Sequence, residues 1–157
     1  MSDPTFLTPA AHEKLRAELE HLTTVGRTEI AERIAEARSH GDLRENADYD
    51  AAKNDQGLME ARIRQLTHLL EHAEVRVATE SDVVEVGSLV TTTDEDGDEM
   101  RYFVAPPENR VPGVLLASPT SPVGKALLGA AVGDMVAYEA PGGTFSLTIT
   151  AIDPFEG

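Results

Sequence analysis

The sequence predicts an α+β protein in two parts: an N-terminal antiparallel α-helical coiled-coil hairpin, and a small C-terminal antiparallel β domain with one short helix. Two observations support this class. Before about residue 75, apolar residues recur at helical spacing and no proline follows Pro9. Beyond that point valine, threonine, glycine and proline become frequent. We expect a coiled-coil domain over 1–76, a linker over 77–82 and a globular domain over 83–157.

The composition excludes several classes of function. With 28 acidic and 13 basic residues, the formal net charge is -15, which argues against gripping free DNA or an anionic membrane with the whole surface. The chain has no cysteine, which excludes disulfides, thiolate metal sites and cysteine nucleophiles. No apolar run approaches the roughly 20 residues of a membrane span, and the N-terminus lacks a signal-peptide pattern. A cytoplasmic protein without membrane contact is expected.

The first long helix is expected to begin at Thr8-Pro9, a capping residue followed by a proline at the first helical position. It should end near His40-Gly41. Its apolar stripe consists of two sets, Leu15, Leu19, Leu22 and then Ile30, Ile34, Ala37. The two sets are out of strict heptad phase and Gly26 lies between them, which predicts a local bend or unwinding.

The second long helix carries a seam that steps alternately by four and three residues: Met59, Ile63, Leu66, Leu70, Ala73. Toward its start the stripe becomes polar, and Asn46 is a candidate N-cap. At about 1.5 Å per residue, helices of about 28–30 residues form a hairpin about 45 Å long. A narrow projection with a charged tip suits the placing of a few side chains deep inside another molecule.

The predicted tip contains two carboxylates, Asp42 and Glu45, spaced three residues apart. Paired carboxylates suit a hard cation such as Mg²⁺ or general acid–base chemistry. The alternative is an ordinary acidic turn, with Glu45 favoured near the start of the next helix. Two carboxylates are too few to hold Mg²⁺ well, so a partner would have to supply further ligands.

Basic residues gather around the same tip: Arg38, Arg44 and Lys53. They are candidates for phosphate contacts. The alternative is surface ion pairing with nearby acidic residues, each pair contributing little. The histidines along the helices are interpreted as separate surface residues and not as a metal cluster: His12, His21, His68, His72.

In the second part, alternating apolar residues predict strands around 84–90, 100–104, 114–116, 134–139 and 144–152, with a turn at Asp96-Gly97. A short helix is expected between Ser121 and Leu128. Ser121 and Pro122 fit a helix start, as a cap and a first helical residue.

Several stretches of the sequence match one known family: 29–53 and 56–63, and then 121–129, 132–134 and 141–143. The most specific of them is Gly41-Asp42-Leu43-Arg44-Glu45-Asn46-Ala47-Asp48-Tyr49. On these stretches the chain resembles the bacterial GreA/GreB family of transcript-cleavage factors. The pattern fits less well over 105–112 and at Thr120, which precedes Ser121-Pro122.

The resemblance implies a β domain with an FKBP-like fold that docks at the rim of the secondary channel of RNA polymerase, through the β′ subunit. The hairpin then reaches the active centre, where Asp42 and Glu45 share Mg²⁺ with the polymerase and promote cleavage at the 3′ end of backtracked RNA. The protein would be an accessory factor and a monomer, not an enzyme in itself. Arg38, Lys53 and Arg44 match RNA-binding positions, and Asn46 and Tyr49 match positions that support the tip. Ser121 and Pro122 match the polymerase-docking segment.

Two other functions remain open from the sequence. A related channel-binding protein could inhibit the polymerase, although the tip retains the spacing of Asp42 and Glu45. An FKBP-like domain could also bind peptides or isomerise proline, but a fold by itself does not establish function.

Overall fold

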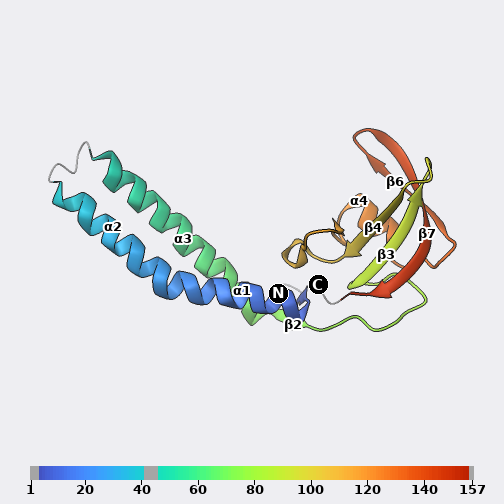
Figure 1. Ribbon diagram of the computed structural model, residues 1–157, viewed down its shortest axis with the longest axis horizontal. Helices are drawn as coiled ribbons and strands as arrows, with labels where there is room; N and C mark the ends of the chain where they lie inside the picture. Colours follow the sequence, from blue (N-terminus) through green and yellow to red (C-terminus); the bar gives the residue numbers. More distant parts are fainter. Residues whose placement is uncertain (1–3, 41–45, 156–157) are drawn as a thin grey trace. The chain divides into compact units, whose positions relative to one another are not determined.

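The structure is a computed structural model that describes residues 4–40 and 46–155 (Figure 1). The chain forms two compact units. One runs from Glu13 to His72 and is helical, and the other joins the described residues up to His12 with those from Ala73 onward and is rich in strands. The predicted α+β class is confirmed.

Three helical segments follow one another without a break: α1 (Pro9–His21), the π-helical turn η1 (Leu22–Gly26) and α2 (Arg27–Ser39). The cap at the start is present, because Thr8 Oγ1 accepts the backbone N–H of Ala11 at 3.0 Å. The irregularity expected near Gly26 is also present and takes the form of the π-helical turn.

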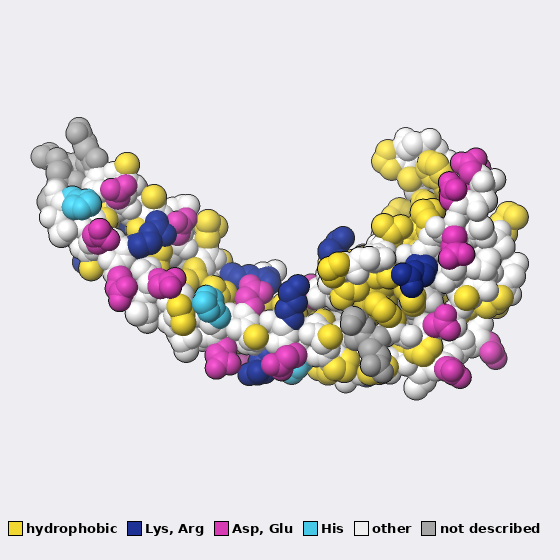
Figure 2. All heavy atoms as spheres, viewed as in Figure 1, with side chains coloured by type: hydrophobic (Ala, Val, Ile, Leu, Met, Phe, Trp, Pro, Cys, Tyr) yellow, Lys and Arg dark blue, Asp and Glu magenta, His cyan; other side chains and the backbone are white. Residues whose placement is uncertain are grey.

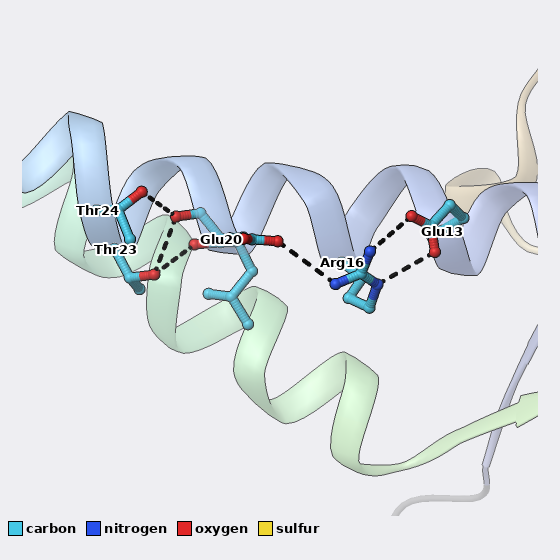
Figure 3. A network of polar contacts seen from close by, with 6 residues as sticks. Glu13, Arg16, Glu20, Thr23 and Thr24 are labelled. Carbon is cyan, nitrogen blue, oxygen red and sulfur yellow. Dashed lines mark hydrogen bonds and ion pairs between the residues drawn. The ribbon is translucent and has the colours of Figure 1, made fainter.

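The π-helical turn explains why the apolar stripe slips in phase. The second set of apolar residues, from Ile30 onward, lies one residue later than a heptad continued from Leu15 would place it. A π-turn accommodates one extra residue, so both sets can follow one side of the helix. Figure 3 shows the hydroxyls of Thr23 and Thr24 turned back toward the preceding turn, where they donate to the carbonyls of Leu19 at 2.9 Å and Glu20 at 2.7 Å.

The second long helix, α3 (Ala47–Glu71), lies beside α2 and runs antiparallel to it (Figure 1). Ile30 and Ile34 of α2 are buried together with Ala52 of α3, and Tyr49 and Met59 pack against this cluster. The helix ends at Glu71, so the expectation that Ala73 continues the helical seam is wrong.

Ala73 instead begins strand β2 (Ala73–Val75), which pairs in parallel with β1 (Thr5–Leu7). Neither strand was expected, because three residues are too few to show an alternating pattern. The pairing joins the N-terminal residues to the strand-rich unit, whereas the sequence grouped them with the helices. The segment 77–82 contains no helix or strand, yet Ala78 is buried within the strand-rich unit near Gly87.

The main sheet has five strands in the order β5-β4-β3-β7-β6 (Figure 1). Their bounds are β3 (Ser88–Asp94), β4 (Glu99–Val104), β5 (Leu115–Ala117), β6 (Met135–Ala140) and β7 (Gly143–Pro154). The expected purely antiparallel sheet is wrong at one place, since β4 and β5 are parallel. Between them the chain crosses over through the 3₁₀ turn η2 (Pro107–Asn109), and β5 therefore starts in the same direction as β4.

The short helix expected between Ser121 and Leu128 is present as α4 (Pro122–Leu127). Its buried residue Leu127 joins the main core beneath the sheet with Val90, Val104, Leu147 and Ile149. Among the described residues, none of the helices combines the length and the apolar character that crossing a membrane requires.

Candidate functional site

The end of the helical hairpin is held together by Asn46. Its Oδ1 accepts the backbone N–H of Tyr49 at 3.0 Å, which confirms it as the N-cap of α3. Its Nδ2 donates to the backbone carbonyl of Ala37, in the last turn of α2. The buried side chain of Asn46 thus satisfies a free backbone N–H at the start of α3 and a free backbone carbonyl at the end of α2. The end of α2 and the start of α3, which flank residues 41–45 in the sequence, are therefore joined through Asn46.

Next to this clamp, Arg38, Tyr49 and Lys53 form what we call the basic face. The Nη2 of Arg38 donates to the Tyr49 hydroxyl at 3.5 Å, and the guanidinium lies 5.6 Å from the centre of the ring. Tyr49 and Lys53 are four residues apart on α3 and so lie on one side of the helix. The hydrogen bond from Arg38, helped by the charge of Lys53, lowers the pKa of Tyr49 below its ordinary value.

Farther from the tip, basic residues on the two helical segments are matched with acidic ones. Arg27 pairs with Glu60 at 3.0 Å, Arg33 with Asp55 at 3.0 Å, and Arg62 with Glu18 at 2.7 Å: Figure 2 shows acidic and basic side chains interspersed along this unit. The basic face breaks this pattern. Within the described ranges, neither Arg38 nor Lys53 forms an ion pair, and Lys53 Nζ instead donates to Gln56 Oε1 at 3.0 Å.

The partners of Arg38 and Lys53 help to decide between the two interpretations of these cations, phosphate contact and surface ion pairing. Ion pairing with Asp48 or Asp50 does not engage Arg38 or Lys53; the only described cross-tip contact to Asp48 comes from His40 Nδ1, at 4.0 Å. Among the residues that the structure describes, the cationic groups of the basic face therefore have no carboxylate partner, and phosphate is an anion that both arginine and lysine bind.

The predicted metal-binding carboxylates, Asp42 and Glu45, and the predicted RNA contact Arg44 lie outside the described residues. In the sequence they fall between the end of α2 and the N-cap residue of α3. Near the described ends of α2 and α3, a hollow is lined by Arg33, Glu36, Ala37, His40, Asp48 and Ala51.

The residues predicted to dock on the polymerase begin α4. Ser121 Oγ accepts the backbone N–H of Gly124 at 3.1 Å and donates to the carbonyl of Ser118 at 2.7 Å. Pro122 is the first residue of the helix. The helix-start interpretation is confirmed, and docking stays a prediction. Thr120 contacts Ser118 Oγ at 3.0 Å and so belongs to the same turn.

Sequence reasoning missed two features of the described residues. It identified Asn46 as a cap but not its bond to Ala37, because that bond depends on how the helices pack. It also treated the histidines as separate, although the four-residue spacing of His68 and His72 was a signal that their rings could meet.

Both parts of the chain match known protein families. The family described as "Transcription elongation factor, N-terminal" matches residues 5–75, and "Transcription elongation factor, GreA/GreB, C-term" matches residues 78–154. Transcription elongation factor GreA of Streptomyces coelicolor is 45% identical, over 98% of this chain and 95% of that protein. The GreA of Thermoanaerobacter pseudethanolicus is 43% identical, over 97% and 99%. The crystal structure of GreA factor homolog 1 from Thermus thermophilus is 29% identical, covers 96% of this chain and 99% of that chain, and has a TM-score of 0.45.

Both units therefore match transcription elongation factors. Within that class, the chain belongs to the GreA/GreB family.

Proposed function

We propose that this protein binds in the secondary channel of bacterial RNA polymerase and stimulates the polymerase's own Mg²⁺-dependent cleavage of backtracked RNA. Stalled complexes would then resume elongation from the new 3′ end. The observation that carries this proposal is the basic face, whose two cations lack carboxylate partners in the described structure. In the sequence, these two cations flank the segment that contains Asp42 and Glu45. The chain acts as an accessory factor, and the polymerase supplies the catalytic centre.

The donor set fits a shared magnesium ion. Asp42 and Glu45 offer hard carboxylate oxygens, the ligands that Mg²⁺ prefers, but they fill only part of an octahedral shell, so the polymerase supplies the rest. When bound, such an ion stabilises charge on the attacking and leaving oxygens of a phosphodiester. The chain's own part is positional: Asn46 fixes the helix ends on either side of the two carboxylates.

The basic face would hold the RNA. Arg38 and Lys53, joined by Arg44, contact phosphates of the displaced 3′ segment. The contact between Arg38 and Tyr49 limits the motion of a long side chain, which reduces the entropy lost when phosphate binds.

The strand-rich unit would act as the anchor, and we assign it an FKBP-like fold, with the two long helices forming an antiparallel coiled coil. Ser121 and Pro122 would contact the β′ subunit at the channel rim, where the start of α4 is held by the bonds to Ser118 and Gly124. The protein would act in the cytoplasm as a monomer.

A stalled, backtracked elongation complex with end-labelled RNA and Mg²⁺ tests the proposal. The wild-type protein should speed RNA cleavage, and Asp42→Ala or Glu45→Ala should abolish the stimulation while still binding the polymerase. Arg38→Ala and Lys53→Ala should each weaken it about tenfold, the effect of losing about 1.4 kcal/mol of phosphate binding.

Arg64→Ala is the matched control, since it removes an exposed cation of α3 away from the tip and should leave cleavage unchanged. Binding that slows cleavage or RNA synthesis would identify an inhibitor of the polymerase and contradict the proposal. So would full activity in the Asp42 and Glu45 variants.

A further inference from the structure

Two histidine side chains meet at the end of α3. His68 lies in its last turn and His72 is its C-cap residue, and their ring centres are 4.3 Å apart with the planes tilted by 37°. Both side chains are exposed. The contact follows from the spacing of four residues, which places two side chains on the same side of a helix, one turn apart.

The hydrogen bonding of His72 fixes which ring nitrogen carries the proton. Its Nδ1 lies 2.8 Å from the backbone carbonyl oxygen of His68. A carbonyl oxygen only accepts, so Nδ1 donates and the neutral ring keeps its lone pair on Nε2. Histidines that bind metals commonly donate their other nitrogen to a carbonyl or carboxylate in this way, which orients the ring and makes the free nitrogen a better ligand.

We propose that His68 and His72 form a two-imidazole site for a transition-metal ion of the Cu²⁺, Ni²⁺ or Zn²⁺ type. Bonds of about 2.0–2.1 Å from one ion to two imidazole nitrogens place those nitrogens about 3 Å apart. Rings whose centres are 4.3 Å apart, tilted instead of stacked flat, reach this separation by small rotations of exposed side chains. The site is separate from the tip carboxylates and their proposed Mg²⁺.

The ligand chemistry selects the ion. Imidazole suits Cu²⁺, Ni²⁺ and Zn²⁺, whereas Mg²⁺ prefers oxygen ligands. Within the described part of the chain, no third histidine or carboxylate joins this pair closely enough to complete a larger cluster, so water fills the remaining positions. The sequence contains no cysteine, so no thiolate competes for the ion.

Binding would act as a clamp on the helix end. An ion held by residues one turn apart links the last turn of α3 to its cap, where helices otherwise fray. His72 is also the last residue of the helical unit, directly before β2. The clamp would therefore slow local opening at the point where the chain leaves the hairpin.

Calorimetric titration of the full-length protein, prepared without a histidine tag, tests the site. One equivalent of Cu²⁺ or Ni²⁺ should bind, Cu²⁺ more tightly than Ni²⁺ or Zn²⁺, and Mg²⁺ should not bind there. His68→Gln and His72→Gln should each weaken Ni²⁺ binding at least tenfold. His21→Gln is the matched control, an exposed histidine of the same unit, and should bind like the wild type. Unchanged affinity in the two variants, or an equal loss in the control, would overturn the proposal.

Nuclear magnetic resonance locates the ion independently of affinity. Paramagnetic Cu²⁺ should broaden amide signals in the last two turns of α3 and at the start of β2. The carboxylates of Asp94, Asp96 and Asp98 approach one another in the turn between β3 and β4, so broadening centred on that turn would overturn the assignment to the histidines.

Discussion

The backbone N–H of Thr8 donates to Oδ1 of Asn109 at 2.8 Å, across 101 positions of sequence. The Nδ2 of Asn109 donates to the carbonyls of Phe6 at 2.9 Å and Pro106 at 3.1 Å. One fully buried side chain thus ties strand β1 and the start of α1 to the 3₁₀ turn η2. Asn109 belongs to 105–112, where the resemblance to the family is weakest, so this atypical segment has a structural role.

Replacing Asn109 with Ala should lower the free energy of unfolding by about 3 kcal/mol, because two buried hydrogen bonds, to Thr8 and Phe6, and one partly buried bond, to Pro106, are lost. Urea denaturation followed by circular dichroism measures the change. Asn54→Ala, an exposed position on α3, is the control and should have little effect. A change below about 1 kcal/mol for Asn109→Ala would show that water replaces the side chain.

Two substitutions of Asn46 distinguish the contributions of its two hydrogen bonds. Asn46→Asp keeps an acceptor for the Tyr49 N–H but removes the donor to Ala37, whereas Asn46→Ala removes both. Asn46→Ala should destabilise the hairpin by about 1–2 kcal/mol and Asn46→Asp by less. In the RNA cleavage assay both should be impaired, because either change loosens one helix end. Full cleavage activity in Asn46→Asp would mean that the bond to Ala37 does not position the tip.

Two glycines should respond to alanine in opposite directions. A Cβ on Gly124 would lie 1.9 Å from the backbone oxygen of Ser118, so Gly124→Ala should destabilise the strand-rich unit by about 3 kcal/mol. Gly57 is in the middle of α3 with no atom near its Cβ position, and Gly57→Ala should stabilise by about 0.5–1 kcal/mol. Thermal unfolding of each variant checks both signs.

The π-helical turn predicts an uncommon tolerance of deletion. Removing the exposed residue Val25 should convert η1 to regular α-helix and bring Ile30 and Ile34 into heptad phase with Leu15. We expect the helical circular dichroism signal to persist and the stability to change by less than about 1 kcal/mol. The control is the insertion of one alanine after Thr24. It puts the apolar stripe from Ile30 onward two residues out of heptad phase with Leu15 and should lower the stability by clearly more. Equal losses in the two variants would contradict this account.

The ion pair between Glu18 and Arg62 predicts a dependence on pH. Its hydrogen bonds, 2.7 and 2.9 Å long, lower the pKa of Glu18 below its ordinary 4.5. A lowered folded-state pKa adds stability that is present above pH 4.5 and is lost as the pH falls through the folded value. Glu18→Gln should therefore cost a few tenths of a kcal/mol at pH 7, and this cost should shrink as the pH falls below 4.5 and through the folded-state pKa. Glu32→Gln, at an exposed position on α2, should show no such trend.

Much of this architecture could be predicted because the long helices repeat their pattern over many turns. The slip between Leu22 and Ile30 predicted an irregularity, but a bend and a π-turn leave the same one-residue signature in sequence. The three-residue strands β1 and β2 are too short to alternate visibly, and the parallel pairing of β5 depends on a long crossover. At the tip, the sequence identified Arg38 and Lys53. That no described carboxylate pairs with them depends on how α2 and α3 are aligned along each other.

Because β1 pairs with β2, the helical hairpin is an insertion in the strand-rich unit, between two strands that are neighbours in one small sheet. Both points of entry are closed by the same short parallel ladder, Thr5 beside Ala73 and Leu7 beside Val75. A fragment that starts at residue 78 therefore loses Phe6, which is buried in the cluster with Phe103 and Ala105. An exchange of residues 13–72 for the hairpin of a relative, by contrast, should leave every strand pairing of this unit in place.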